Sequence, residues 1–288
     1  MEHQGNDLKE PKADTEAKTG SDVSAATPPG TAAARAAAPR RRWPRRVAIV
    51  LVALVVAAAL AVAAFLVYAS DYYRDADAAH ENLVSTPQLP VTQGAHYLAF
   101  GDHAAETGLV FYPGAKVEYT AYAPLMRDLA ARGYLAVVVE MPFNFAFFGI
   151  NAADEVRETF PQVREWWIGG HSLGGSMAAQ YAADHADDGA LAGLVLLGAY
   201  TASDLSASDL GALVVYGSED QVLNRGKLAD SAALMPEGAR TIEIVGGNHA
   251  GFGAYGPQEG DGTATISAEE QREQTIDAVD SYIASRAT

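Results

Sequence analysis

The chain has 288 residues, of which 49% are hydrophobic and 19% charged, enough for one globular core of about 200 residues plus additional segments. It contains no cysteine, which excludes disulfides, zinc–thiolate sites and a cysteine nucleophile. The formal net charge of −16 is unevenly distributed along the chain, as described below.

Residues 1–46 are rich in alanine, proline, glycine, lysine and glutamate and show no sustained apolar period. Such a segment cannot bury enough apolar surface to offset the entropy lost on ordering. We therefore expect residues 1–46 to form a disordered tail.

Residues 47–68 form an apolar segment of 22 residues without a single charge. At the rise of an α-helix this length spans a bilayer core of roughly 30 Å, so the sequence predicts one transmembrane helix. Arginine is concentrated just before the segment, whereas Arg74 stands alone in the comparable stretch after it. We therefore expect a single-pass protein of the cell membrane whose N-terminus lies in the cytoplasm and whose C-terminal part lies outside, as the positive-inside rule predicts. A cleaved signal peptide is the alternative, although the long N-terminal region favours an uncleaved signal-anchor.

The charge changes sign across this segment. Residues 1–46 carry nine Lys or Arg and six Asp or Glu, whereas residues 71–288 carry eleven and thirty. We expect a linker at 69–84 and an acidic domain at 85–288. Because a negative field repels phosphate backbones, nucleic acid is not an expected partner.

The C-terminal domain alternates short apolar runs with helical patterns, which is typical of an α/β fold whose mainly parallel sheet has helices on both faces. Expected strands are Leu109–Tyr112, Leu135–Glu140, Trp167–Gly170, Gly193–Leu197, Ala212–Tyr216 and Thr241–Val245. Expected helices are Tyr119–Arg132, Ala152–Phe160, Leu173–Asp184, Lys227–Leu234 and Ala268–Ala284. Ser267 and Glu270 form a capping box at the start of the last helix.

The sequence Gly170-His171-Ser172-Leu173-Gly174 matches the pattern G-x-S-x-G. It lies between an expected strand and an expected helix, which is the structural context that gives this pattern its chemical meaning. At such a sharp turn the hydroxyl of Ser172 is exposed above the sheet edge as a nucleophile. The backbone N–H of Leu173 would point at the negative oxygen that develops during attack.

A serine hydroxyl is a weak nucleophile at neutral pH and needs a general base. His249 follows the expected strand Thr241–Val245, and Asp220 follows Ala212–Tyr216, so both lie at carboxyl ends of strands, where catalytic groups of parallel sheets gather. We expect a Ser172–Asp220–His249 triad, with Glu219 as the rival acid. His171 is expected to pack inside the fold.

The second donor of an oxyanion hole is expected in the loop that follows Leu109–Tyr112, which reads Pro113-Gly114-Ala115-Lys116. Ala115 is the preferred donor and Lys116 the alternative. An ordinary Pro-Gly turn without a catalytic role remains the other interpretation.

Taken together and in this order, FYPGAKV, GGHSLGG, YGSED and GGNHAGFG resemble the α/β-hydrolase superfamily, and more narrowly its compact esterase-like, lipase-like and dienelactone-hydrolase-like members. The resemblance covers about residues 109–284. It implies an α/β-hydrolase fold and acyl transfer through an acyl-enzyme, without a metal or an organic cofactor. The loop after the first expected strand lacks the HGGG sequence of one lipase group, which leaves the second oxyanion donor open.

Two further features concern the substrate, expected to be a small-molecule ester. Only about ten residues, 201–210, lie between the region of the expected strand Gly193–Leu197 and the expected strand Ala212–Tyr216, so no cap domain is expected there. The run Met141–Phe148 contains four phenylalanines that would form either an apolar wall for an acyl group or ordinary core packing. An acyltransferase with the same triad, or a catalytically silent surface binding protein, are the alternative functions.

Overall fold

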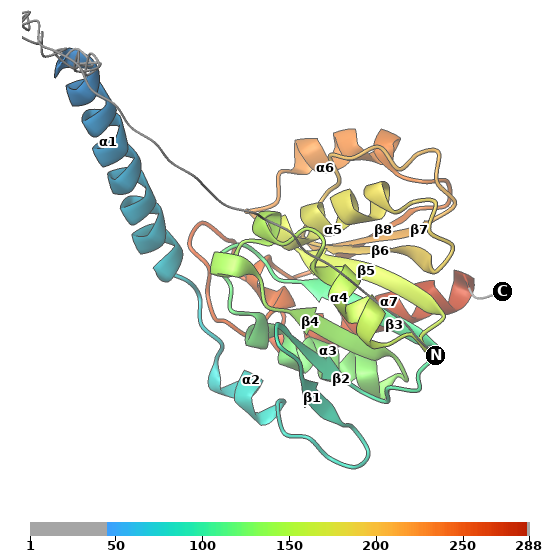
Figure 1. Cartoon of the computed structure of the whole chain (residues 1–288). Helices are drawn as coiled ribbons and strands as arrows, with labels where there is room; N and C mark the ends of the chain where they lie inside the picture. Colours follow the sequence, from blue (N-terminus) through green and yellow to red (C-terminus); the bar gives the residue numbers. More distant parts are fainter. Residues whose placement is uncertain (1–44, 287–288) are drawn as a thin grey trace, which may run out of the picture. The chain divides into compact units, whose positions relative to one another are not determined.

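The computed structural model describes residues 45–286, so the expected N-terminal tail lies almost entirely outside the described residues. Residues up to Ala53 and residues from Leu54 onward form two separate compact units. The second unit holds the whole sheet and is shown in Figure 1.

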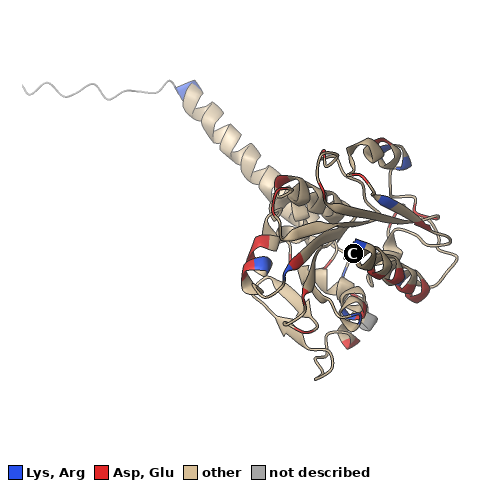
Figure 2. Ribbon diagram, turned by 90° about the vertical axis from the view of Figure 1, so that its right-hand side faces the viewer, with Lys and Arg blue, Asp and Glu red and all other residues tan. Residues whose placement is uncertain are grey.

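The first helix, α1 (Arg45–Ser70), is long and apolar enough to cross a membrane, and none of its most apolar window is buried. Figure 2 shows charged residues only at its N-terminal end. The prediction of an apolar helix at 47–68 is confirmed, with two additional residues at each end.

The segment expected as a linker, residues 69–84, contains a short helix, α2 (Asp77–Glu81). Tyr73 in the same segment forms an isolated parallel bridge with Val117. The linker is therefore bonded to the C-terminal domain rather than free of it.

Eight strands form one sheet in the order β1-β2-β4-β3-β5-β6-β7-β8. The six strands from β3 to β8 are parallel, whereas β1 and β2 are antiparallel to their neighbours. The α/β fold with a mainly parallel sheet is thus confirmed. The strands are β1 (Val91–Gln93), β2 (Tyr97–Phe100), β3 (Thr107–Tyr112), β4 (Leu135–Val139), β5 (Glu165–His171), β6 (Leu191–Leu197), β7 (Gly211–Gly217) and β8 (Arg240–Ile244).

Helices cover both faces of the sheet (Figure 1). Successive residues of β4 alternate between two apolar clusters, since Val137 belongs to one and Val138 to the other. One face is covered by α4 (Ala152–Thr159) and α5 (Leu173–Asp184), the other by α3 (Ala123–Ala131) and α7 (Ala268–Arg286).

Local signals explain where several helices begin. Pro124 lies in the first turn of α3, so the expected helix at 119–132 opens instead with a separate 3-10 turn at Tyr119–Tyr122. Asn224 caps α6 (Arg225–Ser231) by accepting a bond from the Lys227 N–H. The hydroxyl of Ser267 accepts a bond from the Glu270 N–H at the start of α7, as the capping box predicts.

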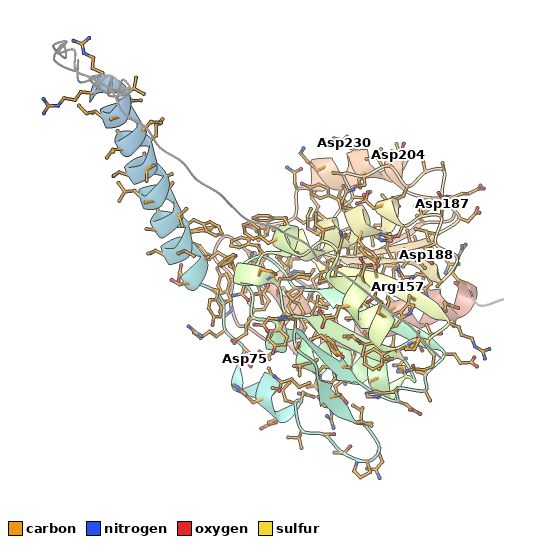
Figure 3. The ribbon with its side chains drawn as sticks, in the orientation of Figure 1. Asp75, Arg157, Asp187, Asp188, Asp204 and Asp230 are labelled. Carbon is orange, nitrogen blue, oxygen red and sulfur yellow. The ribbon has the colours of Figure 1, made fainter. Side chains whose placement is uncertain are left out.

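The edge of the sheet away from the carboxyl ends of its strands is held by an ion pair. Arg157 of α4 donates to Asp188, in the turn before β6, at 2.5 Å; both are labelled in Figure 3. This contact fixes α4 against the loop between α5 and β6.

Candidate active site

Ser172 occupies a strained turn between β5 and α5. Its φ of 53° and ψ of −124° lie in a region that residues with a side chain rarely adopt. The Ser172 N–H donates to the Leu197 carbonyl of β6 at 2.9 Å, and this bond anchors the turn at the carboxyl edge of the sheet. The strained residue of this turn is the one that the sequence predicts as the nucleophile.

The two glycines of the pattern allow the helix to start so close to the strand. A Cβ on Gly170 would overlap the backbone of Gly174, and a Cβ on Gly174 would overlap the carbonyls of Tyr112 and Pro113. Glycine is therefore required at both positions because two backbones meet there without space for a side chain.

Asp220 and His249 form a pair removed from solvent. Asp220 lies in the turn after β7 and His249 in the loop after β8, and His249 Nδ1 donates to Asp220 Oδ2 at 2.8 Å. Oδ1 of the same carboxylate accepts bonds from the N–H groups of Val222 and Leu223. The side chain of His249 is 1% exposed and that of Asp220 is 0% exposed. With Nδ1 occupied, His249 Nε2 has no hydrogen-bond partner among residues 45–286.

This pair lies next to the Ser172 turn. Gly198 directly follows Leu197, the residue bonded to Ser172, and a Cβ on Gly198 would lie 3.0 Å from His249 Nδ1 and 3.2 Å from Asp220 Oδ2. The rings of His171 and His249 have centroids 4.4 Å apart. The structure therefore brings the three residues of the expected triad to one edge of the sheet.

Glu219, the rival acid, has a different environment. Its carboxylate accepts a bond from the Ser218 hydroxyl at 2.9 Å, and its N–H donates to the Gly247 carbonyl. The carboxylate that contacts His249 is that of Asp220.

The loop after β3 offers one unused backbone donor. The Gly114 N–H donates to the Tyr122 hydroxyl at 3.0 Å, and the Lys116 N–H donates to the Asn144 carbonyl at 2.8 Å. The N–H groups of Ala115 and Leu173 bond to no residue in the described part of the chain. Of the two donors considered in this loop, Ala115 is thus the available one, because Lys116 is occupied.

Tyr122 is a site residue that the sequence did not reveal. Its hydroxyl accepts the Gly114 N–H and lies 2.8 Å from His171 Nδ1, to which it can donate. His171 is buried, as expected, and its ring packs beside that of His249. Burial, reinforced by the neighbouring His249, lowers the pKa of His171 well below its ordinary value, so this ring is neutral.

Gln271 of α7 is the second unexpected residue. Its side-chain amide is buried and makes two bonds to the backbone of one residue in the loop that carries His249, accepting from the Asn248 N–H at 3.0 Å and donating to the Asn248 carbonyl at 2.8 Å. A Cβ on Gly251 would overlap this amide. Gln271 thereby fixes the backbone on which His249 is carried. Its place in an ordinary helical pattern gives no signal of this role.

The phenylalanine-rich run expected as a pocket wall or as core divides between two environments. Phe145 is buried, whereas Phe143, Phe147 and Phe148 are exposed. These three line a surface pocket of about 580 Å³ between Met141 and α4, whose lining does not include the triad residues.

Within residues 45–286, no group of three or more His, Asp or Glu side chains is placed to hold a metal ion.

Comparison with known proteins identifies the family. A family model described as "Alpha/beta hydrolase family" matches residues 108–273, more than half of the chain. No curated protein matches the sequence at the threshold applied.

Solved structures share the fold at low sequence identity. An esterase of Pyrobaculum calidifontis matches with a TM-score of 0.52 and 16% identity, over 71% of this chain and 88% of that one. An α/β-hydrolase enzyme from the sediment metagenome of the Mar Chica lagoon gives 0.52 and 14%, over 69% and 99%. A structure from a study of carboxylesterases of the thaumarchaeon Nitrososphaera gargenis gives 0.51 and 13%, over 71% and 98%. With its strained turn at Ser172, its mainly parallel sheet and the family match over residues 108–273, this chain belongs to the alpha/beta hydrolase family.

Proposed function

We propose that the protein is a serine hydrolase that cleaves an ester-type acyl substrate, with Ser172 as nucleophile, His249 as general base and Asp220 as the acid that orients it. The observation that carries this proposal is the buried Asp220–His249 pair beside the strained Ser172 turn, with His249 Nε2 left free. This arrangement supplies a base next to a positioned hydroxyl.

In the reaction, Ser172 Oγ attacks the ester carbonyl while His249 Nε2 accepts the hydroxyl proton. Asp220 holds the imidazole tautomer and stabilises the imidazolium cation, whose burial would otherwise be unfavourable. The proton then passes to the leaving alcohol, and Ser172 keeps the acyl group. Water, deprotonated by His249, releases the carboxylic acid and restores the enzyme.

The negative oxygen of each tetrahedral intermediate is stabilised by the N–H groups of Leu173 and Ala115. Leu173 is the first residue of α5, where the helix dipole adds positive potential. Because neither N–H is bonded to another described residue, both are available without rearrangement.

We also propose that α1 spans the cell membrane as an uncleaved anchor, with the N-terminus in the cytoplasm and the hydrolase domain outside. The length and apolarity of α1 and the arginines before it support this topology.

A serine-directed fluorophosphonate probe tests the nucleophile. The full chain should be labelled at Ser172, because labelling requires an activated hydroxyl and an oxyanion site. Labelling should disappear in Ser172→Ala and persist in the matched variant Ser176→Ala, which lies one helical turn further along α5. Equal labelling of the Ser172→Ala chain would refute the assignment.

A further inference from the structure

The segment that follows α1 is hydrogen-bonded directly to residues 113–118 after β3. The part that carries Ala115, residues 113–116, is called the oxyanion loop below. The Tyr73 N–H donates to the Lys116 carbonyl at 2.7 Å, and the Glu118 N–H donates to the Tyr73 carbonyl at 2.9 Å. Tyr73 is three residues beyond Ser70, the last residue of α1, and three residues span at most about 10 Å. The loop that carries Ala115 is therefore held close to the end of the apolar helix, whatever the tilt of that helix.

Lys116 makes a second connection at the same place. Its Nζ lies 3.2 Å from the Asp71 carboxylate and 4.3 Å from the centre of the Tyr68 ring. Its own N–H donates to Asn144 in the phenylalanine-rich run. One residue thus joins the end of α1, the oxyanion loop and this run.

The phenylalanine-rich loop, defined here as residues 141–150, contains no charged residue. Phe143, Phe147 and Phe148 are 50%, 43% and 48% exposed. Phe143 has a φ of 57°, a conformation that is unfavourable for a bulky residue, and yet its ring remains outside the core. A cluster of exposed aromatic rings of this kind marks an interaction surface.

The position of this loop indicates what covers it. The ring of Phe65, in the last part of α1, lies 5.6 Å from that of Phe143 and 5.7 Å from that of Phe148. The exposed rings therefore continue the apolar surface of the last part of α1. Residues 71–288 carry thirty acidic and eleven basic residues, so anionic lipid would not attract the domain, and attachment must be apolar.

We infer that the phenylalanine-rich loop inserts into the surface of the bilayer spanned by α1 and that the site takes its substrate from that bilayer. The substrate class is then an ester of a long acyl chain held in the membrane. The acyl group passes to Ser172, the alcohol leaves with the proton, and water releases the fatty acid. This inference rests on the proposed function.

Insertion is tested with the full chain in phosphatidylcholine vesicles. Because the protein has no cysteine, Phe147→Cys gives a single labelling site for an environment-sensitive fluorophore. Asp187→Cys, exposed in the turn before β6 at the other edge of the sheet (Figure 3), is the control. Nitroxide-bearing lipids should quench the fluorophore at position 147 at least threefold more than the one at 187. Equal quenching at both positions would overturn the inference.

Substrate delivery is tested with the combined variant Phe143→Ser, Phe147→Ser and Phe148→Ser. On p-nitrophenyl acetate in water its kcat/KM should stay within about twofold of the unaltered chain, which also reports correct folding. On p-nitrophenyl palmitate dissolved in the vesicles its rate should fall at least tenfold. Equal loss on both esters, or no loss on either, would contradict delivery from the membrane. If the unaltered chain hydrolyses neither ester, the proposed function fails, while the quenching measurement still decides the insertion.

Discussion

Both carboxylate oxygens of Asp220 accept hydrogen bonds. Oδ2 accepts from His249, while Oδ1 accepts from two backbone N–H groups that fix the orientation of the carboxylate. An amide at this position would keep the shape but could not stabilise the imidazolium. We expect Asp220→Asn to lower kcat by about 10³- to 10⁴-fold on p-nitrophenyl acetate, by analogy with other serine triads. Glu219→Gln, the matched change one residue away, should alter kcat by less than about tenfold. Folding is compared by circular dichroism; the reverse ranking in folded variants would exchange the two roles.

His171 should make the stability of the protein depend on pH. Burial lowers its pKa in the folded state, so below the unfolded value of about 6.5 the unfolded chain binds a proton that the folded chain does not. The contribution of neutral His171 to the free energy of unfolding is therefore complete above about pH 6.5. It decreases by about 1.4 kcal/mol per pH unit as the pH falls from there toward the folded-state pKa. His171→Asn keeps an acceptor for the Tyr122 hydroxyl without titrating. Urea unfolding at pH 7.5 and 5.5 should show a smaller loss of stability for this variant, and an unchanged loss would contradict the assignment.

The three residues of the proposed triad, Ser172, Asp220 and His249, could be predicted from the sequence, because each follows a strand in a recognisable local pattern. Tyr122 and Gln271 could not, since their roles depend on tertiary contacts with Gly114, His171 and Asn248. A tyrosine or glutamine in a helical pattern has many possible partners, and only the fold selects one.

Among the elements, the junction of β5, α5 and β3 depends on the absence of a side chain at Gly174. Alanine there would push its Cβ into two carbonyls of β3 and the loop that follows, so α5 would have to shift. We expect Gly174→Ala to lower the free energy of unfolding by about 1–3 kcal/mol and, because the Leu173 N–H moves, to lower the proposed activity on p-nitrophenyl acetate. Gly189→Ala, at a loop position with nothing within 4 Å of the new Cβ, should change neither. Equal urea midpoints for the two variants would show that the packing at Gly174 is not limiting.

The six predicted strands lie within two residues of the observed ones. Most of them are buried apolar runs, as the five buried residues of β4 illustrate, whereas in the edge strand β8 only Ile244 is buried. The antiparallel strands β1 and β2 were not predicted. β1 has only three residues, and none of them is fully buried, so neither its length nor its pattern distinguishes it from a loop.

At the scale of the whole molecule, the proposed orientation of α1 in the membrane would decide which compartment supplies the substrate. The arginines before α1 favour a cytoplasmic N-terminus, and the tail carries a net charge of +3 against −19 for residues 71–288. The absence of cysteine makes a direct test possible, because one introduced thiol reports one compartment. In intact cells that express the full chain, a membrane-impermeant maleimide should label Asp187→Cys within minutes and should label Ser24→Cys only after lysis. A permeant maleimide should label both variants equally and so controls for thiol reactivity. Labelling of Ser24→Cys in intact cells with Asp187→Cys protected would invert the topology, while a labelled domain that is released from washed membranes would show that α1 is cleaved.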